Sequence, residues 1–218
     1  MDPTLPKLAE VEWGKFKVSD LFNVYNSKPH HKNQLKTDSK GIPYITRTNT
    51  ENGLNDTVKY TGSLNPKNVI TVGAENAKFF AQPYTFITGN KMYYIAEKKQ
   101  SLSFKQCLFL TCLFQNSFGE NQYGYGLGLT GTRVMRGIII LPIVSPDEPD
   151  WHYMEQYIIN EIEKHRVPEL EEPKDSPIDG LKSIFETDFK RHSEPRLPST
   201  AQINHQLRLI TYLNPGKH

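Results

Sequence analysis

Short stretches of alternating hydrophobic and polar residues fill most of the chain before Pro149, a pattern typical of half-buried β-strands. Glycine, asparagine and proline residues separate many of them and favour turns. Asn52–Gly53 is the clearest of these turn signals. The stretches that predict strands are residues 22–25, 42–46, 58–61, 69–72, 85–88, 92–96 and 134–143.

Two longer apolar stretches predict helices. Residues 102–118 have the length and the density of apolar side chains expected of a helix packed in a core. From Trp151 onward apolar residues recur at helical spacing, with Asp150 placed to cap the first turn. This helix is expected to end near Val167, before Pro168. Many short strands with one long helix between them predict an α+β fold.

We place one domain in residues 1–149 and a helical or linker segment in residues 150–218, because the strand pattern ends at this point. Residues 1–12 are predicted to be a loose leader. The longest compact apolar run, residues 138–144, is far shorter than the ~20 residues of a membrane span, and the N-terminus lacks a signal segment. We therefore expect a cytoplasmic protein that does not enter a membrane.

The composition, with 37% hydrophobic and 23% charged residues, is that of a folded protein. Cys107 and Cys112 both fall in the predicted core helix, so we interpret them as core residues rather than as a disulfide or a zinc site. The net charge is +2 and is unevenly divided. Residues 1–150 contain 17 Lys and Arg against 13 Asp and Glu, whereas residues 151–218 contain 9 against 11. The first part is the better candidate for a surface that faces phosphates.

Polar side chains gather in the segment that follows the predicted strand 42–46. Arginine and lysine hold phosphates, and the arginine fork matches guanine edges in the major groove of DNA. Threonine and asparagine add short hydrogen-bonding groups. The candidate contact residues of this segment are Arg47, Thr48, Asn49 and Asn52. The alternative is a solvated hairpin loop without a ligand.

Two further predicted turns carry similar groups. Residues 73–78 form a loop before Phe79 and Phe80, which are expected to turn into the core, and residues 89–91 form a turn between two strands. The candidate contact residues of these two turns are Asn76, Lys78, Asn90 and Lys91. The alternative for both is an ordinary surface turn.

A glycine-rich segment, residues 121–128, supplies another kind of loop, and two arginines follow it closely. Glycine lets a backbone approach a ligand, and tyrosine can stack or form hydrogen bonds. The candidate contact residues are Tyr123, Tyr125, Arg133 and Arg136. The alternative is a mobile surface loop, since the segment does not match the glycine motifs that bind phosphates.

Candidates for catalysis are few. Glu97 and Lys99 end a predicted strand, and together with Asp56 they could form the magnesium-binding site of a nuclease. A charged strand end is the simpler interpretation, because short patterns of this kind often arise by chance. The seven histidines show no metal-ligand spacing, and there is no methyltransferase motif. We predict no catalytic residue, no metal site and no cofactor in this chain.

The chain contains four segments whose order and spacing are distinctive. They are Trp13 and Phe16 with Leu21–Phe22, then Gly41–Thr48, then Asn68–Gly73 with Phe79–Phe80, and finally Ile138–Ile143 with Pro149–Glu155. In this arrangement they resemble the target-recognition domain of the DNA specificity subunits of type I restriction–modification systems and of their type IIB and IIG relatives. The resemblance covers about residues 11–165.

The resemblance implies a mixed, strongly twisted β-sheet with a core helix, and sequence-specific binding of double-stranded DNA without chemistry of its own. Partner subunits of such systems methylate and cleave DNA with S-adenosylmethionine and Mg²⁺, so a modification (methyltransferase) subunit is the implied partner. The chain has a single recognition domain, and Pro168 and Pro173 interrupt the helix that would dock the partner. A homodimer would restore two half-sites.

Two alternatives to this hypothesis remain. The first is a fragment of a restriction endonuclease or modification enzyme with its own metal-dependent activity, which would use Glu97 and Lys99. The second is a protein-interaction domain with the same fold that does not bind DNA.

Overall fold

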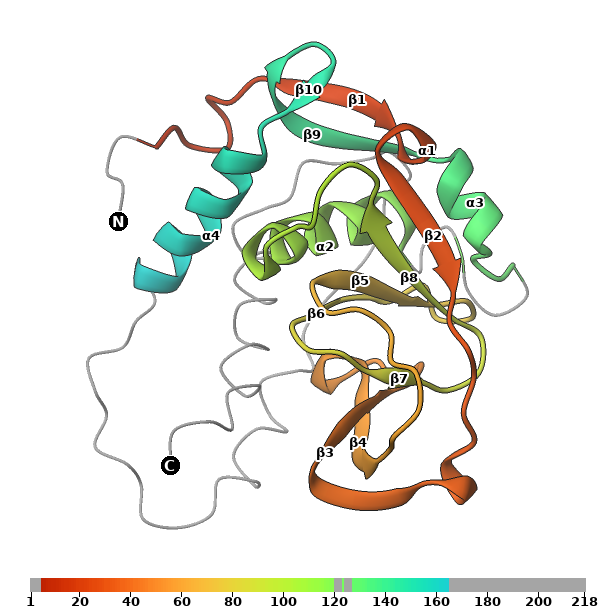
Figure 1. Ribbon diagram of the computed structural model, residues 1–218. Helices are drawn as coiled ribbons and strands as arrows, with labels where there is room; N and C mark the ends of the chain where they lie inside the picture. The colour runs from red at the N-terminus through yellow and green to blue at the C-terminus, as the bar shows by residue number, and fades with distance from the viewer. Residues whose placement is uncertain (1–4, 120–122, 124–126, 165–218) are drawn as a thin grey trace.

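The computed structural model describes residues 5–119, 123 and 127–164, which form an α+β fold of three small sheets and a central helix (Figure 1). The helices are α1 (Val18–Leu21), α2 (Phe104–Phe118), α3 (Gly131–Arg136) and α4 (Trp151–Lys164). The strands are β1 (Trp13–Lys17), β2 (Phe22–Asn26), β3 (Lys36–Ile45), β4 (Leu54–Lys59), β5 (Val69–Gly73), β6 (Phe79–Gln82), β7 (Ile87–Thr88), β8 (Met92–Glu97), β9 (Ile138–Ser145) and β10 (Glu148–Pro149). Short 3₁₀ turns occupy Lys32–Gln34 and Glu51–Gly53.

The central sheet has the order β2-β8-β5-β6, and all its neighbouring strands are antiparallel. Every residue of β5 is buried, including the polar Thr71, whose hydroxyl donates to Phe80 O at 3.2 Å. The second sheet has the order β4-β3-β7, with β3 and β7 parallel, and the third has the order β1-β9-β10. The fold is therefore mixed, as expected.

Helix α2 lies in the middle of the fold and contacts β5, β6, β9 and α4. Its start is fixed by a capping box, in which Ser103 Oγ accepts from Gln106 N at 3.1 Å and Gln106 Oε1 accepts from Ser103 N at 2.8 Å. Gln115 ties the helix to the central sheet, because its amide accepts from Phe79 N at 3.0 Å and donates to Ala77 O at 3.1 Å. The prediction of a core helix is confirmed.

An aromatic cluster fills the space between α2 and the central sheet. Phe114 contacts Phe22 edge-on at a ring-centroid distance of 5.4 Å and stacks on Phe79 at 5.6 Å and on Phe118 at 6.0 Å. The side chains of Phe22, Phe79 and Phe114 are fully buried. The prediction that Phe79 and Phe80 turn into the core is correct.

The segment before β1 is not the loose leader that the sequence predicted, at least from residue 5 onward. Leu5, Leu8 and Val11 pack against the main core. Trp13 Nε1 donates to Leu8 O at 3.1 Å, and Tyr153 Oη donates to Pro6 O at 3.0 Å. The bond from Tyr153 joins α4 to the N-terminal segment across 147 positions, a pairing that no local sequence pattern indicates.

Helix α4 begins where the sequence predicted, and Asp150 Oδ1 accepts from Tyr153 N at 2.8 Å as a cap. Tyr153, Met154, Tyr157 and Ile158 belong to the same core cluster as α2. Helix α4 therefore shares the core of the first part of the chain. The boundary at residue 149 and the character of residues 165–218 stay predictions.

One predicted strand is partly wrong. Residues 134–136 belong to helix α3, in which Thr130 Oγ1 accepts from Arg133 N at 3.3 Å and caps the first turn, and Val134 is buried. Gly137 follows the helix, and β9 begins only at Ile138. Within the described residues, none of the helices is long and apolar enough to span a membrane.

The aromatic cluster yields a prediction about stability. Phe114→Ala should lower the free energy of unfolding by about 3–5 kcal/mol, because it leaves a cavity between α2 and the central sheet. Urea unfolding measures this change. Val144→Ala is the control, since Val144 is 66% exposed and its truncation should change stability by no more than about 0.5 kcal/mol. An equal effect of the two substitutions would contradict this packing.

The cysteines yield a second prediction. Burial raises the pKa of both Cys107 and Cys112 to about 12, so their thiols stay protonated at neutral and mildly alkaline pH. Both should resist a thiol reagent such as DTNB at pH 8 in the native protein and react once urea unfolds it. Rapid modification of either cysteine in the native protein would contradict their burial.

Candidate functional site

The turn between β5 and β6, residues 73–78, is the meeting point of three segments that are distant in the sequence. Ala74 N donates to Lys91 O at 3.0 Å, which attaches the turn before β8. Ala74 O accepts from Leu129 N at 2.7 Å, which attaches the segment before α3. Asn76 Nδ2 donates to Arg47 O at 2.8 Å, which attaches the loop after β3. Two backbone hydrogen bonds and one from the Asn76 side-chain amide thus set the positions of these segments.

Asn76 holds the loop after β3 at a second point as well, since its Nδ2 also donates to Asn49 Oδ1 at 2.8 Å. Gly73 makes this approach possible. A Cβ atom added there would lie 2.2 Å from Asn76 Oδ1 and 2.9 Å from Arg47 Cγ, closer than real Cβ atoms approach other heavy atoms. A larger residue at the end of β5 would therefore have to push the Asn76 and Arg47 side chains aside.

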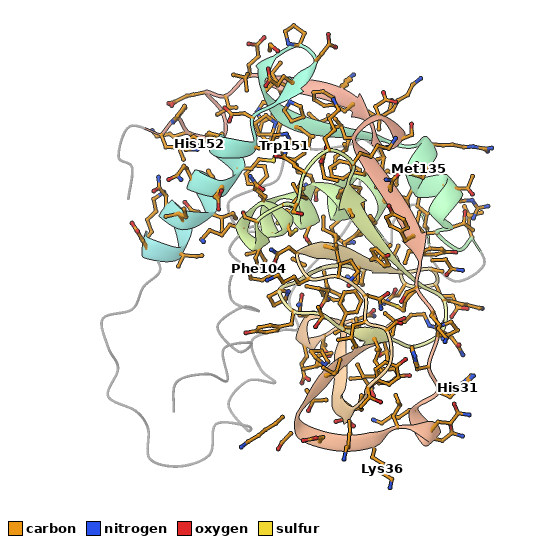
Figure 2. All side chains as sticks on the ribbon, in the orientation of Figure 1. His31, Lys36, Phe104, Met135, Trp151 and His152 are labelled. Carbon is orange, nitrogen blue, oxygen red and sulfur yellow. The ribbon has the colours of Figure 1, made fainter. Side chains whose placement is uncertain are left out.

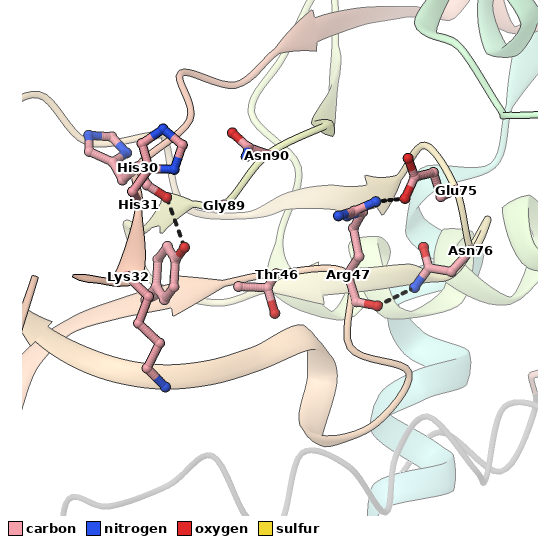
Figure 3. Close-up of a pocket in the computed structure, with 10 residues that line it drawn as sticks. His30, His31, Lys32, Thr46, Arg47, Glu75, Asn76, Gly89 and Asn90 are labelled. Atoms are coloured by element: carbon pink, nitrogen blue, oxygen red, sulfur yellow. Dashed lines mark hydrogen bonds and ion pairs between the residues drawn. The ribbon is translucent and has the colours of Figure 1, made fainter. Parts of the chain in front are cut away.

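A single carboxylate connects two cations at this meeting point. Glu75 forms ion pairs with the Arg47 guanidinium and with the Lys91 ammonium group, and Figure 3 shows the pair with Arg47. The Arg47 side chain is 35% exposed and that of Lys91 63% exposed, so solvent screens both pairs and each stabilises the fold only modestly. Their main effect is to orient the two cationic side chains.

An open pocket of about 550 Å³ lies beside this ion-pair cluster (Figure 3). Its lining residues come from the loop before β3, the end of β3 and the two turns described above. They are His30, His31, Lys32, Tyr44, Thr46, Arg47, Glu75, Asn76, Gly89 and Asn90. A wide pocket with mainly hydrogen-bonding side chains fits an extended polar surface better than a small apolar ligand.

Hydrogen bonds connect the wall of the pocket to the neighbouring sheet. Tyr44 Oη donates to His30 O at 2.8 Å, and burial raises the pKa of Tyr44, so its phenol stays protonated for this bond. Gly89 N donates to Ile45 O at 2.9 Å, and His30 N donates to Thr88 O at 2.8 Å. These bonds fix the floor and one side of the pocket to the sheet of β4, β3 and β7.

Asp56 lies on β4, at the edge of the same sheet, and its carboxylate contacts Thr37, Thr57 and Lys32. Burial raises the pKa of Asp56, but hydrogen bonds from Thr57 N, Thr37 Oγ1 and Lys32 Nζ outweigh it and hold that pKa below its ordinary value. Glu97 Oε2 accepts from Lys99 N at 2.6 Å, which closes the turn after β8.

Asp56 on β4 and Glu97 on β8 therefore belong to strands of two different sheets. Among residues 5–119, 123 and 127–164, no group of three or more His, Cys, Asp and Glu side chains is placed to hold a metal ion.

The structure brings together about half of the candidate contact residues. Arg47, Asn49, Asn76, Asn90 and Lys91 surround the turn of residues 73–78 and the pocket. Thr48 lies in the same loop, with its Oγ1 3.3 Å from Thr50 Oγ1. Lys78 is half-buried at the far end of the turn.

Asn52 is a correction, because it is buried and uses its polar groups inside the protein. Its Nδ2 donates to Ala81 O at 2.7 Å, and its backbone carbonyl accepts from Gln82 Nε2 at 3.1 Å. Asn52 and Gly53 both have positive φ angles, which confirms the predicted turn. Asn52 thus anchors the loop after β3 instead of pointing out of it.

The structure places the candidate contact residues of the glycine-rich segment in different environments. Tyr123 is partly buried and packs against the main core, and its role as a DNA contact stays a prediction. Tyr125 lies outside the described residues. Arg133 is exposed and donates to Gly128 O, next to the segment that contacts Ala74, while Arg136 is exposed at the end of α3.

The sequence interpretation missed Glu75, His30 and His31 as residues of the site. Glu75 stands directly before the candidate Asn76, which was the available signal, but an acidic residue did not fit a surface for phosphates. Adjacent histidines do not have metal-ligand spacing, and their sequence indicates no other site chemistry. Nothing in their local pattern indicates that the segment before β3 folds back onto the turn of residues 89–91.

Comparisons with known proteins agree with this fold. Residues 10–172 match the family model for the type I restriction modification DNA specificity domain. The chain is 30% identical over 213 residues to the type II restriction enzyme BgcI specificity subunit S.BcgI of Heyndrickxia coagulans, a match that covers 94% of this chain. It spans only 59% of that relative, so the relative is much the longer protein.

Two solved structures share the fold at low sequence identity. One is the crystal structure of the S subunit of a type I restriction-modification system from M. genitalium, with a TM-score of 0.50 and 13% identity over 75% of this chain and 42% of that chain. The other was solved to explain complex assembly and conformational transition of the type I R-M system, with a TM-score of 0.51 and 10% identity over 75% of this chain and 41% of that chain.

The family match covers most of the chain, including every described strand and helix from β1 to α4. The predicted resemblance is confirmed, and the chain belongs to the type I restriction modification DNA specificity domain family.

Proposed function

We propose that this chain recognises a specific sequence in double-stranded DNA and directs the methylation or cleavage subunits of a restriction–modification system to it. One observation carries the proposal. Mostly polar and charged residues from four stretches of the chain, 30–32, 44–47, 75–76 and 89–90, line one open pocket, and hydrogen bonds hold these stretches together. Loops held in place on a β scaffold can read base edges, because direct readout requires hydrogen-bond donors and acceptors in defined positions.

The side chains of these loops match the hydrogen-bonding groups of the base edges in the major groove. An arginine fork such as Arg47 can bind guanine O6 and N7, and an asparagine such as Asn49 or Asn90 can bind adenine N6 and N7. Lys32 and Lys91 are exposed at the rim of the site, where they can approach phosphates. The bond from Asn76 to Asn49 limits how Asn49 can turn, so Asn90 is the freer of the two amides to read a base.

The division of labour with partners is part of the same proposal. The relative S.BcgI is named as a specificity subunit of a restriction enzyme, which supports assigning methylation and cleavage to a separate modification subunit. S-adenosylmethionine and Mg²⁺ would act there and not in this chain. Because the chain spans 59% of that relative, a homodimer is one way to present two recognition domains to two half-sites.

The proposal is tested by selecting duplexes from a random pool with the purified protein and then measuring binding to the selected sequence at several salt concentrations. The expected result is a recurrent sequence and an affinity that falls linearly with the logarithm of salt concentration. Metal-dependent cleavage of plasmid DNA by the protein alone would favour the enzyme alternative. Absence of duplex binding, alone or with a modification subunit, would favour the interaction-domain alternative.

Substitution of Arg47 tests the base-reading role. Arg47→Ala should weaken binding to the selected duplex by about 1–3 kcal/mol and relax the base preference at one position, because a bidentate contact is lost. Competition binding against single-base variants of the duplex measures both effects.

The matched control is Lys15→Ala, which also removes one positive charge but lies exposed on β1. It should leave the base preference unchanged. If Arg47→Ala weakened all duplexes equally and no more than Lys15→Ala does, Arg47 would be a phosphate contact or no contact at all.

A further inference from the structure

The carboxylate of Glu75 lines the pocket but is not expected to raise its affinity for DNA. Of the ten described residues that line the pocket, it is the only acidic one, and two of the others are Lys32 and Arg47. A carboxylate at this place repels the phosphates of any duplex that approaches. It also ties up two cations that would otherwise attract them, because it pairs with both Arg47 and Lys91.

The turn binds Arg47 and Lys91 at two points each. One point is the backbone carbonyl of the residue, and the other is its charged group, which pairs with Glu75. Asn76 Nδ2 binds the Arg47 carbonyl oxygen at 2.8 Å while Glu75 binds the Arg47 guanidinium. Ala74 N binds the Lys91 carbonyl oxygen at 3.0 Å while Glu75 binds the Lys91 ammonium. Three consecutive residues therefore fix both the backbone and the charged end of each cationic residue. Lys91 has a φ of 57°, a left-handed conformation that sets the direction of its side chain.

We propose that Glu75 is a specificity-determining positioning residue, which holds Arg47 and Lys91 in the free protein and lowers their affinity for duplexes of the wrong sequence. This inference rests on the proposed function. Specificity is a difference between two affinities, and it can be gained by weakening the wrong complex. On an unrelated sequence the two cations gain only screened phosphate contacts in exchange for their pairs with Glu75. On the correct sequence Arg47 gains a base edge as well, so the exchange is favourable there.

The clearest test is Glu75→Gln, which removes the charge and keeps the size of the side chain. The matched control is Glu148→Gln, which makes the same change in charge on the exposed strand β10, at the opposite end of the fold from the strands β3 and β7 that border the pocket (Figure 1). Binding of wild type and both variants is measured to the selected duplex and to a random duplex of equal length, between about 50 and 300 mM salt, a range over which counterion release is resolved.

The expected result is that Glu75→Gln binds the random duplex about 10-fold more tightly than wild type at the lowest salt concentration. Its salt dependence on that duplex should be steeper by about 1–2 in slope, because each cation released to a phosphate adds roughly 0.9. The affinity for the selected duplex should change much less, so the preference for it falls. Glu148→Gln should keep the wild-type preference.

Two results would overturn the inference while the proposed function stands. In the first, Glu75→Gln behaves as Glu148→Gln does. In the second, Glu75→Gln loses affinity for the selected duplex and not for the random one, which would make Glu75 a direct base contact. A wild-type protein that binds no duplex, alone or with a modification subunit, would overturn both the inference and the proposed function.

A conservative variant separates charge from structure. Glu75→Asp keeps the carboxylate on a shorter side chain and should retain most of the preference for the selected duplex. Thermal unfolding of each variant establishes that the fold is intact. If Glu75→Asp lost the preference to the same extent as Glu75→Gln, the charge at this position would not be what determines specificity.

Discussion

The side-chain amide of Asn76 joins the turn after β5 to the loop after β3, whose residues lie 27 and 29 positions earlier in the chain. The positions of Arg47 and Asn49 in the candidate site depend on this junction. Without it, Arg47 and Asn49 would belong to a solvated loop and would lose their fixed relation to Glu75 and Lys91. With it, a ligand meets side chains that are already positioned, and the entropic cost of ordering them on binding is small.

A buried network of hydrogen bonds joins the same loop to strands β5 and β6. Gln82 Nε2 donates to Asn52 O at 3.1 Å and to Thr71 Oγ1 at 2.9 Å, and Thr71 Oγ1 donates to Phe80 O at 3.2 Å. The loop after β3 is therefore fastened at both ends, by Asn76 at its start and by Asn52 at its turn. Beneath the network, the aromatic cluster of α2 gives the central sheet its rigidity. Figure 2 shows that Trp151 and His152 of α4 lie at the opposite end of the fold from His31 and Lys36, so α4 is well separated from the candidate DNA-binding face.

Much of the framework could be predicted from the sequence because it depends on local patterns. The apolar density of residues 102–118 specified α2, the alternation from Met92 specified β8, and Asn52–Gly53 specified a turn. The order of the family segments predicted the fold as a whole. Helix α3 was missed because Val134 to Arg136 run directly into the apolar strand residues from Ile138, and the cap from Thr130 lies outside that pattern.

The site was harder to predict because its geometry depends on contacts between distant residues. Asn49 and Asn52 are both asparagines near the same turn, yet one is exposed and the other is buried against Ala81. No local pattern distinguishes them. The role of Glu75 likewise becomes visible only when Arg47 and Lys91 lie on either side of it.

If the segments joined to the turn of residues 73–78 form the DNA-binding face, a selected duplex should protect their backbone amides. Amide hydrogen exchange with and without the duplex measures this protection. DNA is expected to slow exchange in residues 46–50, 73–78 and 89–91 and to leave α4 unchanged. Protection confined to α4 or to β9 and β10, with none in those three segments, would contradict this expectation.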